Sequence, residues 1–581
     1  MNPNKEKITS VLTDGRVFYI PFYQRAYVWG VKLWRRFIKD MEYISSHDEE
    51  YFLGSIILKD LGADGSTATD RQEVIDGQQR LTTFAIFMKV LSLRDASTHN
   101  IFDRKFRLDD GRLTIKHSLS DKDAFEKIAN LTEDTSLDGE ETSNLIKAYN
   151  YFRANVDCEK IKINNILAKT VVISIYLENN ENEHKIFDTI NSLAMKLNTE
   201  ELLKNFLFKK ETLDKYENIW KPVFEADAEC INYWKKEYTI GRNKKTISEG
   251  FFYTLLQIIM HDPRNNISSE DKKDFRRYDD ENIFEYYKTI IASGRWDSIQ
   301  FAQEIAKYAT LYRRIFSKDI MADSDSSKTP LNRILLMVFT LDANTVLPYI
   351  LYIIKNVPDS LEQNNIFVLL ESYIVRRQIC SCGNKNYSDL FTENLIGQQV
   401  KTYDGLSSYL KERNSSLYMP SDNEVKENIH KNNKLSSIKA KCILYLLETK
   451  LRAAHPYQTA LHEFNLYTTE HIMPQNWVVN WPLPDGLDEI QKAEFSEKRK
   501  KMINTLGNLA IITQGLNSSI RDSEWEKKKN GTSSHGGLIK YASDLITLKD
   551  VVTKTEWNEE EISKRADWIA EKANSIWKNI D

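Results

Sequence analysis

The first two hundred residues alternate between short apolar runs and longer segments with helical periodicity. Four β-branched or aromatic runs have the length of strands and are bounded by Gly, Asp or Asn; they lie at 17–20, 51–58, 71–75 and 171–177. After Gln78, apolar residues recur at helical spacing from Leu81 to Leu91. This pattern predicts an α/β domain over residues 1–210.

The rest of the chain shows two further patterns. Residues 211–455 contain long amphipathic segments separated by polar breaks such as ADSDSSKTP, which predicts a helical linker region. Residues 456–581 contain the runs YTTEHIMPQNW and LGNLAIIT, followed by the polar stretch QGLNSSIRDSEWEKKK. That order predicts a strand, a loop, a second strand and a helix. The expected fold class is therefore a multidomain α+β protein that is mostly helical.

Composition narrows the class of protein. The 581 residues include 80 basic and 84 acidic side chains, a net charge of -4, so binding to nucleic acid would have to use local patches. The five cysteines are scattered and do not suggest a disulfide framework, which is typical of a reducing cytoplasm. The N-terminus lacks the apolar core of a signal peptide, and no run is long enough to span a bilayer. We expect a cytoplasmic protein with no membrane partner.

Residue types suited to phosphodiester hydrolysis follow one another near the C-terminus. Such a site needs oxygen ligands for Mg²⁺ and a base beside the attacking water. His471 is the predicted base, because a neutral imidazole titrates near pH 7. Glu470 and Asn517 are the predicted metal ligands, and Asn508 is predicted to cross-link the intervening loop and hold His471 in place. The alternative interpretation is that these side chains only shape loops.

Basic runs lie close to these residues in the sequence. Lys527 and Lys528 belong to a run that we predict to contact DNA phosphates, which would give affinity independent of base sequence. A second run covers 498–501. Glutamates are interspersed in both, so a solvated helix face is the alternative interpretation.

The segment VIDGQQRLTTF predicts an anion site between a strand and a helix. Asp76 and Gly77 end the predicted strand, and Gln78, Gln79 and Arg80 begin the predicted helix. Free N–H groups at a helix start attract phosphate, glycine permits close approach, and an arginine can grip phosphate oxygens bidentately. The chain contains no P-loop sequence, so any nucleotide chemistry here would be of another kind.

A second polar cluster, Gln24 and Arg25, lies among aromatic residues in YQRAYVW. Aromatic side chains interleaved with arginine suit a pocket that stacks a base or nucleotide. A purely structural role is the alternative interpretation for this cluster and for the anion site.

The C-terminal pattern EHIMPQNW, LGNLAIITQGLNSSI and WEKKK resembles the HNH-type (ββα-metal) nuclease domain of GmrSD-type restriction proteins. By this resemblance His471 corresponds to the base, Asn508 to the middle asparagine and Asn517 to the final asparagine. Glu470 takes the acidic position before the base, where other HNH enzymes often carry aspartate.

The N-terminal patterns YQRAYVW and DGQQR resemble the ParB-like N-terminal domain of the same family. The resemblance implies nucleoside triphosphate hydrolysis coupled to sensing of modified DNA. It carries the nucleotide-site roles over to Asp76, Gln78, Gln79 and Arg80.

The resemblance as a whole predicts a type IV restriction endonuclease that cuts double-stranded modified phage DNA with Mg²⁺, under the control of a nucleoside triphosphate. One HNH site cuts one strand, so we expect a homodimer. Two alternatives remain: a nickase or defence nuclease indifferent to modification, and a nucleotide-switched DNA-binding protein with an inactive HNH module.

Overall fold

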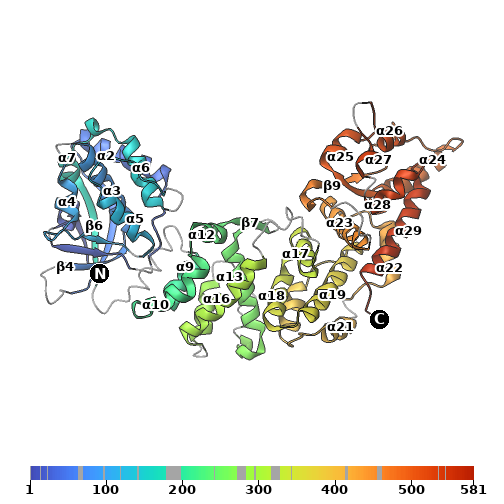
Figure 1. Cartoon of the computed structure of the whole chain (residues 1–581), viewed down its shortest axis with the longest axis horizontal. Coiled ribbons are helices and arrows are strands. Elements are labelled where there is room, and N and C mark those ends of the chain that lie inside the picture. Colours follow the sequence, from blue (N-terminus) through green and yellow to red (C-terminus); the bar gives the residue numbers. More distant parts are fainter. Residues whose placement is uncertain are drawn as a thin grey trace. The chain divides into compact units, whose positions relative to one another are not determined.

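The chain divides into two compact units, Met1–Lys236 and Glu237–Asp581 (Figure 1), which we describe one at a time. The computed structural model describes residues 2–13, 15–21, 24–62, 70–95, 98–117, 119–139, 143–177, 198–240, 243–270, 272, 283–292, 296–315, 328–341, 343–412, 416–454, 461–533, 536–542 and 545–580. In this part of the chain, no helix is both long enough and apolar enough to cross a membrane.

Unit 1 is built on a mixed sheet. Its described strands are β1 (Asn2–Lys7), β2 (Arg16–Tyr19), β3 (Tyr51–Asp60), β4 (Asp70–Asp76), β5 (Ile115–Lys116) and β6 (Thr170–Leu177). They lie in the order β1-β6-β3-β4-β2-β5. The pairs β1/β6 and β3/β4 are antiparallel, and the other neighbours are parallel.

Four of these strands, β2, β3, β4 and β6, confirm the strands predicted from apolar runs. β1 was missed because its sequence, NPNKEK, has no apolar alternation. Its extended conformation comes from pairing with β6, where Lys5 lies opposite Ile173. Backbone hydrogen bonds to a distant strand, which no local pattern encodes, make this segment a strand.

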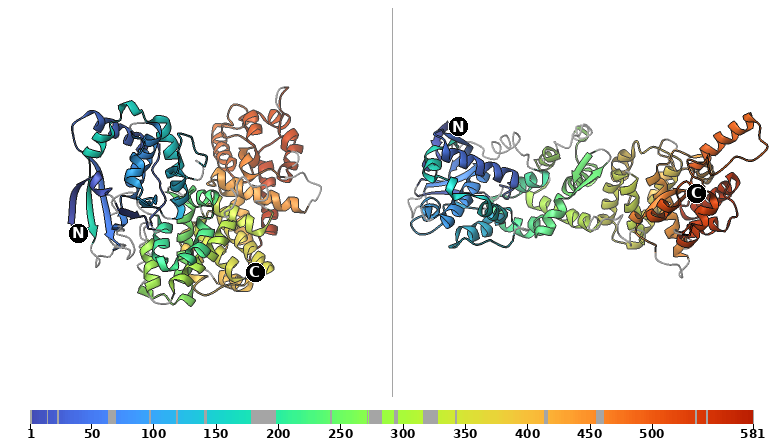
Figure 2. Two further views of the ribbon diagram at one scale, coloured as in Figure 1. Left: turned by 60° about the vertical axis from the view of Figure 1, so that its left-hand side comes forward. Right: turned by 90° about the horizontal axis from the view of Figure 1, so that it is seen from above.

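The helices within residues 31–155 gather on one face of the sheet (Figure 2). The helices of unit 1 are α1 (Ile8–Val11), α2 (Val31–Ser46), α3 (Gln78–Arg94), α4 (Ile101–Phe106), α5 (Leu119–Ala129), α6 (Asn144–Asn155), α7 (Ile163–Lys169), α9 (Thr199–Leu207), α10 (Leu213–Lys215), α11 (Lys221–Phe224) and α12 (Ala228–Lys235). Phe37, Phe87 and Phe152 join α2, α3 and α6, with ring centroids 5.4–6.0 Å apart. α3 confirms the predicted helix and is buried along most of its length.

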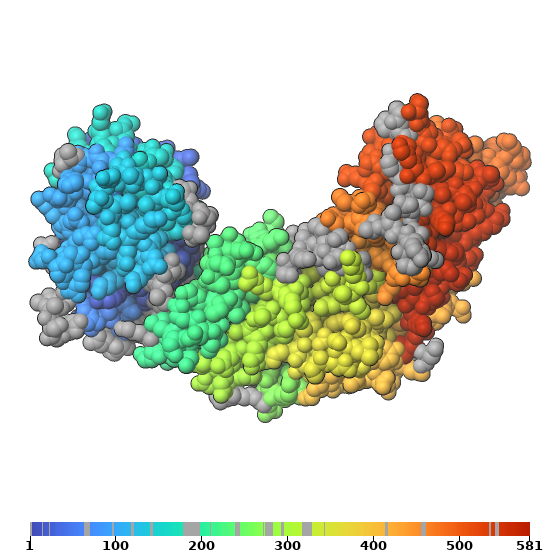
Figure 3. All heavy atoms as spheres, viewed as in Figure 1, coloured from blue at the N-terminus to red at the C-terminus, as the bar shows by residue number. Residues whose placement is uncertain are grey.

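Unit 2 is largely helical and forms a continuous body in the space-filling view, from green to red (Figure 3). Its helices are α13 (Ile247–His261), α15 (Ile283–Ala292), α16 (Ser298–Ile315), α17 (Pro330–Thr340), α18 (Leu347–Asn356), α19 (Ser360–Ile379), α20 (Tyr387–Asp389), α21 (Tyr403–Lys411), α22 (Asp422–Lys431), α23 (Ser437–Ala453), α24 (Glu489–Ile503), α25 (Gln514–Ile520), α26 (Trp525–Asn530), α27 (Leu538–Ala542), α28 (Ile546–Lys549) and α29 (Glu559–Ile576). Its described strands are β7 (Glu237–Ile240), β8 (Asn243–Thr246), β9 (Tyr467–His471) and β10 (Leu509–Thr513).

Two details of unit 2 differ from the prediction. Unit 2 begins with an antiparallel hairpin, β7/β8, inside the segment 211–455 that was predicted to be helical. The predicted loop between the two C-terminal strands contains α24. Its sequence is highly charged and lacks an apolar stripe, but a capping box in which Asp488 and Gln491 bond each other's backbone N–H marks its start.

The C-terminal helix ties the last elements of unit 2 to its helical region. α29 packs against α22. At its end, Trp577 Nε1 donates to Glu371 Oε1 in α19 at 2.7 Å, and Arg376 Nη1 donates to Trp577 O at 2.7 Å. Burying these polar groups as mutual partners avoids the free-energy penalty of unpaired donors. The last elements of the chain therefore share a core with the helical region.

Candidate functional site

The predicted C-terminal residues meet where β9 ends. Glu470 and His471 are the last two residues of β9, which pairs with β10 in antiparallel fashion. α25 begins directly after β10 and packs against β9. In α25, Asn517 Nδ2 donates to Thr469 O at 3.3 Å. Two short strands and a helix thus place Asn517 against the backbone next to Glu470 and His471.

Asn508 is fully buried and cross-links the chain around this site. Its Oδ1 accepts from Met473 N at 2.8 Å and from Trp557 Nε1 at 3.0 Å. Its Nδ2 donates to Met473 O at 2.8 Å and to Ile503 O at 2.9 Å. The amide is therefore fully used in fixing the segment after His471, and it does not face a substrate.

The imidazole of His471 is held by an asparagine that sequence reasoning missed. His471 Nε2 lies 3.0 Å from Asn504 Oδ1, and Gln475 Nε2 donates to the same oxygen at 2.9 Å. With this oxygen as acceptor, Nε2 carries the ring proton and Nδ1 keeps its lone pair. Burial lowers the pKa of His471, and the hydrogen bond to Asn504 acts in the opposite direction. The ring is therefore neutral at pH 7 and suited to accept a proton.

Glu470 and Lys528 form a buried ion pair, which differs from the surface position expected for Lys528. Lys528 Nζ contacts Glu470 Oε1 and donates to His471 O at 2.7 Å. Burial raises the pKa of Glu470 and lowers that of Lys528. The Lys528 charge opposes the rise in the pKa of Glu470, and the Glu470 charge opposes the fall in the pKa of Lys528. In this arrangement the Lys528 ammonium cannot contact DNA phosphates, whereas Lys527 next to it is exposed.

Glu470 and Asn517 offer the types of ligand atom that Mg²⁺ prefers. Carboxylate and amide oxygens are hard ligands, and Mg²⁺ commonly keeps several waters and substrate phosphates in its shell. Glu470 and Asn517 supply one oxygen donor of each kind, and the described residues contain no group of three or more His, Cys, Asp or Glu that could hold a metal by themselves. The Lys528 ammonium, however, already contacts Glu470. A metal ion bound through Oε1 of Glu470 therefore requires that ammonium to move.

Asp522 is a further residue that sequence reasoning missed. Its side chain is exposed, and Asn476 Nδ2 donates to Asp522 Oδ2 at 3.0 Å. Its charge acts on both Glu470 and His471, raising the pKa of each. The aspartate lies in the short segment between α25 and α26, where no periodic signal marks it.

In unit 1, Gly77 forms the junction between β4 and α3. Its φ is +99°, a left-handed conformation that favours glycine. A Cβ there would lie 3.1 Å from Ile56 Cγ1 and 3.2 Å from Ser55 O. On either side of this turn, Arg80 Nη2 donates to Asp76 Oδ2 at 2.8 Å and to Ser55 O at 2.7 Å. The tight turn therefore places Asp76 and Arg80 beside the start of α3.

The two N-terminal motifs contact each other. Gln78 Nε2 donates to Arg25 O at 2.7 Å, and Gln79 Oε1 accepts from Val28 N at 2.9 Å. Gln24 is buried, and its Nε2 donates to Ile75 O at 2.6 Å. All three glutamine amides thus bind backbone groups and hold the Gln24–Val28 segment against the β4–α3 junction.

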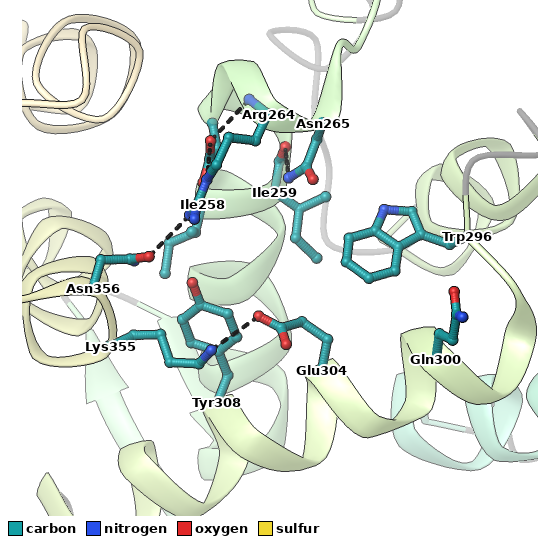
Figure 4. A pocket seen from close by; sticks show the side chains of 11 residues that line it. Ile258, Ile259, Arg264, Asn265, Trp296, Gln300, Glu304, Tyr308, Lys355 and Asn356 are labelled. Atoms are coloured by element: carbon teal, nitrogen blue, oxygen red, sulfur yellow. Dashed lines mark hydrogen bonds and ion pairs between the residues drawn. The ribbon is translucent and has the colours of Figure 1, made fainter.

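A separate cavity of about 390 Å³ lies in the helical part of unit 2 (Figure 4). Its charged groups are paired, Arg264 with Asp262 and Lys355 with Glu304, and Arg264 also donates to Asn356 Oδ1. None of the residues predicted to form a site lines this cavity. It is therefore distinct from both candidate sites.

Comparisons with known proteins cover both sites. The model of the GmrSD restriction endonuclease N-terminal domain matches residues 6–208, and the model of the GmrSD restriction endonucleases C-terminal domain matches residues 419–572. No curated protein matches the chain. The two matched segments cover more than half of the chain and contain the two motif clusters. The chain belongs to the GmrSD restriction endonuclease family.

Proposed function

We propose that this protein is a type IV restriction endonuclease that cleaves modified double-stranded phage DNA at an HNH-type site. The arrangement of β9, β10 and α25 carries this proposal, because it places Glu470 and His471 at the end of one strand and Asn517 on the helix packed against that strand, in the order that such a site requires. Asn508 supports it by fixing the adjoining segment through its amide.

The chemistry follows from the position of each side chain. His471 Nδ1 accepts a proton from the attacking water, while Asn504 holds the ring through Nε2. Glu470 and Asn517 would hold a Mg²⁺ ion. When bound, that ion supplies Lewis-acid polarisation of a phosphate oxygen. Asp522 adds negative charge beside His471, which favours the imidazolium formed as the proton arrives.

The proposed nucleotide site comprises Gln24, Arg25 and the segment Asp76–Arg80 in a ParB-like domain. The start of α3 supports an anion there, because Gly77 provides no side-chain cap for the first N–H groups of the helix. In addition, Arg80 Nε is buried and lacks a hydrogen-bond partner among the described residues. Nucleoside triphosphate hydrolysis at this site would regulate cleavage in unit 2.

Cleavage of matched phage DNAs that differ only in cytosine modification tests the proposal. With Mg²⁺ and a nucleoside triphosphate, we expect cutting of the modified DNA only. We expect His471→Ala to reduce the rate by about 10²–10⁴-fold, the usual contribution of a general base. His462→Ala, an exposed histidine of the same unit, is the control and should cut normally.

The outcomes separate the alternatives. Cutting of both DNAs would favour a nuclease indifferent to modification. Binding without cutting would favour a DNA-binding protein with an inactive nuclease module. Undiminished cutting by His471→Ala would overturn the proposed base.

The nucleotide site has its own test. Arg80→Ala removes the side chain that contacts Asp76 and Ser55 O, and we expect it to abolish nucleoside triphosphate hydrolysis. Arg112→Ala, which affects an exposed arginine paired with Asp110, is the matched control. Normal hydrolysis by Arg80→Ala would mean that the nucleotide binds elsewhere.

A homodimer is part of the proposal, because one HNH site cuts one strand. We expect sedimentation of the protein bound to a short DNA duplex to show two chains on each duplex that is cut in both strands. Paired cuts by a monomer at a single site would contradict the dimer.

A further inference from the structure

Lys528 is buried to a degree that is unusual for a lysine. Its side chain is 1 % exposed, and that of Glu470 is 7 % exposed. Lys528 lies in α26, which is anchored by Trp525 against Trp557, with ring centroids 5.8 Å apart. The helix therefore directs the lysine inward, to the end of β9.

The ammonium group occupies the position of a cation at the nuclease site. It contacts Glu470 Oε1 and lies 2.7 Å from His471 O, so its partners are a carboxylate and a carbonyl oxygen. These are the oxygen types that bind hard divalent cations. Two cations on one buried carboxylate would repel each other strongly, because water does not screen them there. Lys528 and a metal ion on Oε1 of Glu470 therefore exclude each other.

We propose that Lys528 is an internal counter-ion of Glu470, which holds the carboxylate in place without metal and is displaced when a divalent cation binds. This inference rests on the proposed metal-dependent nuclease function and adds a regulatory step to the same site. The ammonium keeps the empty site neutral and ordered, since a buried unpaired carboxylate is unfavourable. It also lowers the intrinsic metal affinity, so that phosphates of bound DNA are needed to complete the metal shell.

Lysine labelling of the unmodified full chain tests the displacement directly. An amine-reactive acylating reagent followed by mass spectrometry should leave Lys528 protected without metal. With saturating Mn²⁺, we expect labelling of Lys528 to rise at least fivefold. Lys527, its exposed neighbour, should be labelled equally in both states. Protection of Lys528 while Mn²⁺ is bound would overturn the proposal.

Metal affinity gives an independent readout. Calorimetric titration with Mn²⁺ alone should show at least tenfold tighter binding to Lys528→Met, which keeps an apolar stem but removes the charge. Lys527→Met and the charge-conserving Lys528→Arg should show no gain. Adding Glu470→Gln to Lys528→Met should abolish the gain and also tests whether the uncharged pair folds.

The two proposals fail in different ways. The counter-ion role would be overturned if a folded Lys528→Met chain bound Mn²⁺ with unchanged affinity, or if the protein bound no Mn²⁺ at all. Either result would mean that metal does not displace Lys528 from Glu470. Failure of the nuclease proposal would appear as absence of cleavage in Mg²⁺, whatever the labelling shows.

Discussion

At the scale of single residues, one buried amide fixes the backbone beside the proposed nuclease site. Asn508 binds both backbone groups of Met473, two residues after His471. Because the amide binds both the N–H and the C=O of one residue, it restrains the direction of the chain there as well as the distance of the chain from Asn508. Among the described residues, Asn504 Oδ1 is hydrogen-bonded only to side chains, those of His471 and Gln475. The two asparagines therefore contribute differently, one to the fold and one to the orientation of His471.

Asn508→Ala should destabilise unit 2 by about 3–4 kcal/mol, because it removes four hydrogen bonds and leaves buried partners unpaired. Asn504→Ala is the matched control and should reduce the free energy of unfolding by less than about 1 kcal/mol. Urea denaturation of the full chain measures both. Equal effects of the two substitutions would contradict this account.

Two buried ionisable residues of unit 1 give opposite pH dependences. Burial lowers the pKa of His117 to about 3, so its contribution to stability is complete above about 6.5 and is lost as pH falls below that value. Burial raises the pKa of Asp121 to about 6, so its contribution is complete below about 3.9 and is lost as pH rises towards 6. Between pH 4 and 6 the two effects cancel.

Asp121→Asn should remove this cancellation. Relative to the unmodified chain, the variant should lose about 1.4 kcal/mol of unfolding free energy for each pH unit between 6 and 4. The asparagine oxygen can still accept from Tyr27 N, which Asp121 binds at 2.7 Å. Denaturation at pH 6, 5 and 4 measures the difference, and a difference independent of pH would show that the two groups do not compensate.

At the scale of elements, the junction of β4 and α3 explains why the N-terminal motif has a glycine at its centre. The turn brings the start of α3 close to β3. A Cβ added at Gly77 would lie 3.2 Å from Ser55 O in that strand. The side chains of the same motif then bind the neighbouring Gln24–Val28 segment. A single turn thus orders two segments that are far apart in the sequence.

Gly77→Ala should destabilise unit 1 by about 2–3 kcal/mol, through both the left-handed φ and the crowding by Ile56 and Ser55. Gly111→Ala separates these causes. Gly111 has φ +83° but no atom within 4 Å of the added Cβ, so only about 1 kcal/mol should be lost. Chemical denaturation compares them, and equal losses would show that crowding is unimportant.

At the scale of the whole molecule, each unit has its own core and its own candidate site. A chain organised in this way is not expected to unfold in one cooperative step. We expect two transitions in scanning calorimetry. Gly77→Ala should lower the midpoint of one by several degrees and Asn508→Ala that of the other. A single transition that both substitutions shift would mean that the units unfold as one.

The sequence by itself determined the family of the protein and much of its local structure. The strands at 51–58, 71–75 and 171–177 were predictable because apolar runs reflect burial within a few neighbouring residues. The two motif clusters indicated the family, because each keeps its chemical groups at short fixed spacings. These signals are local, and a local pattern can be read without knowing the fold.

Tertiary structure decided which side chains meet and which charges are buried. Lys528 lies in a basic run that favours a solvated face, yet it turns inward because Glu470, 58 residues earlier, supplies its counter-charge. Likewise, Asn504 acquires its role only because α24 ends beside His471. The burial of a polar group depends on partners that the folded chain brings from a distance, and the sequence around that group does not encode them.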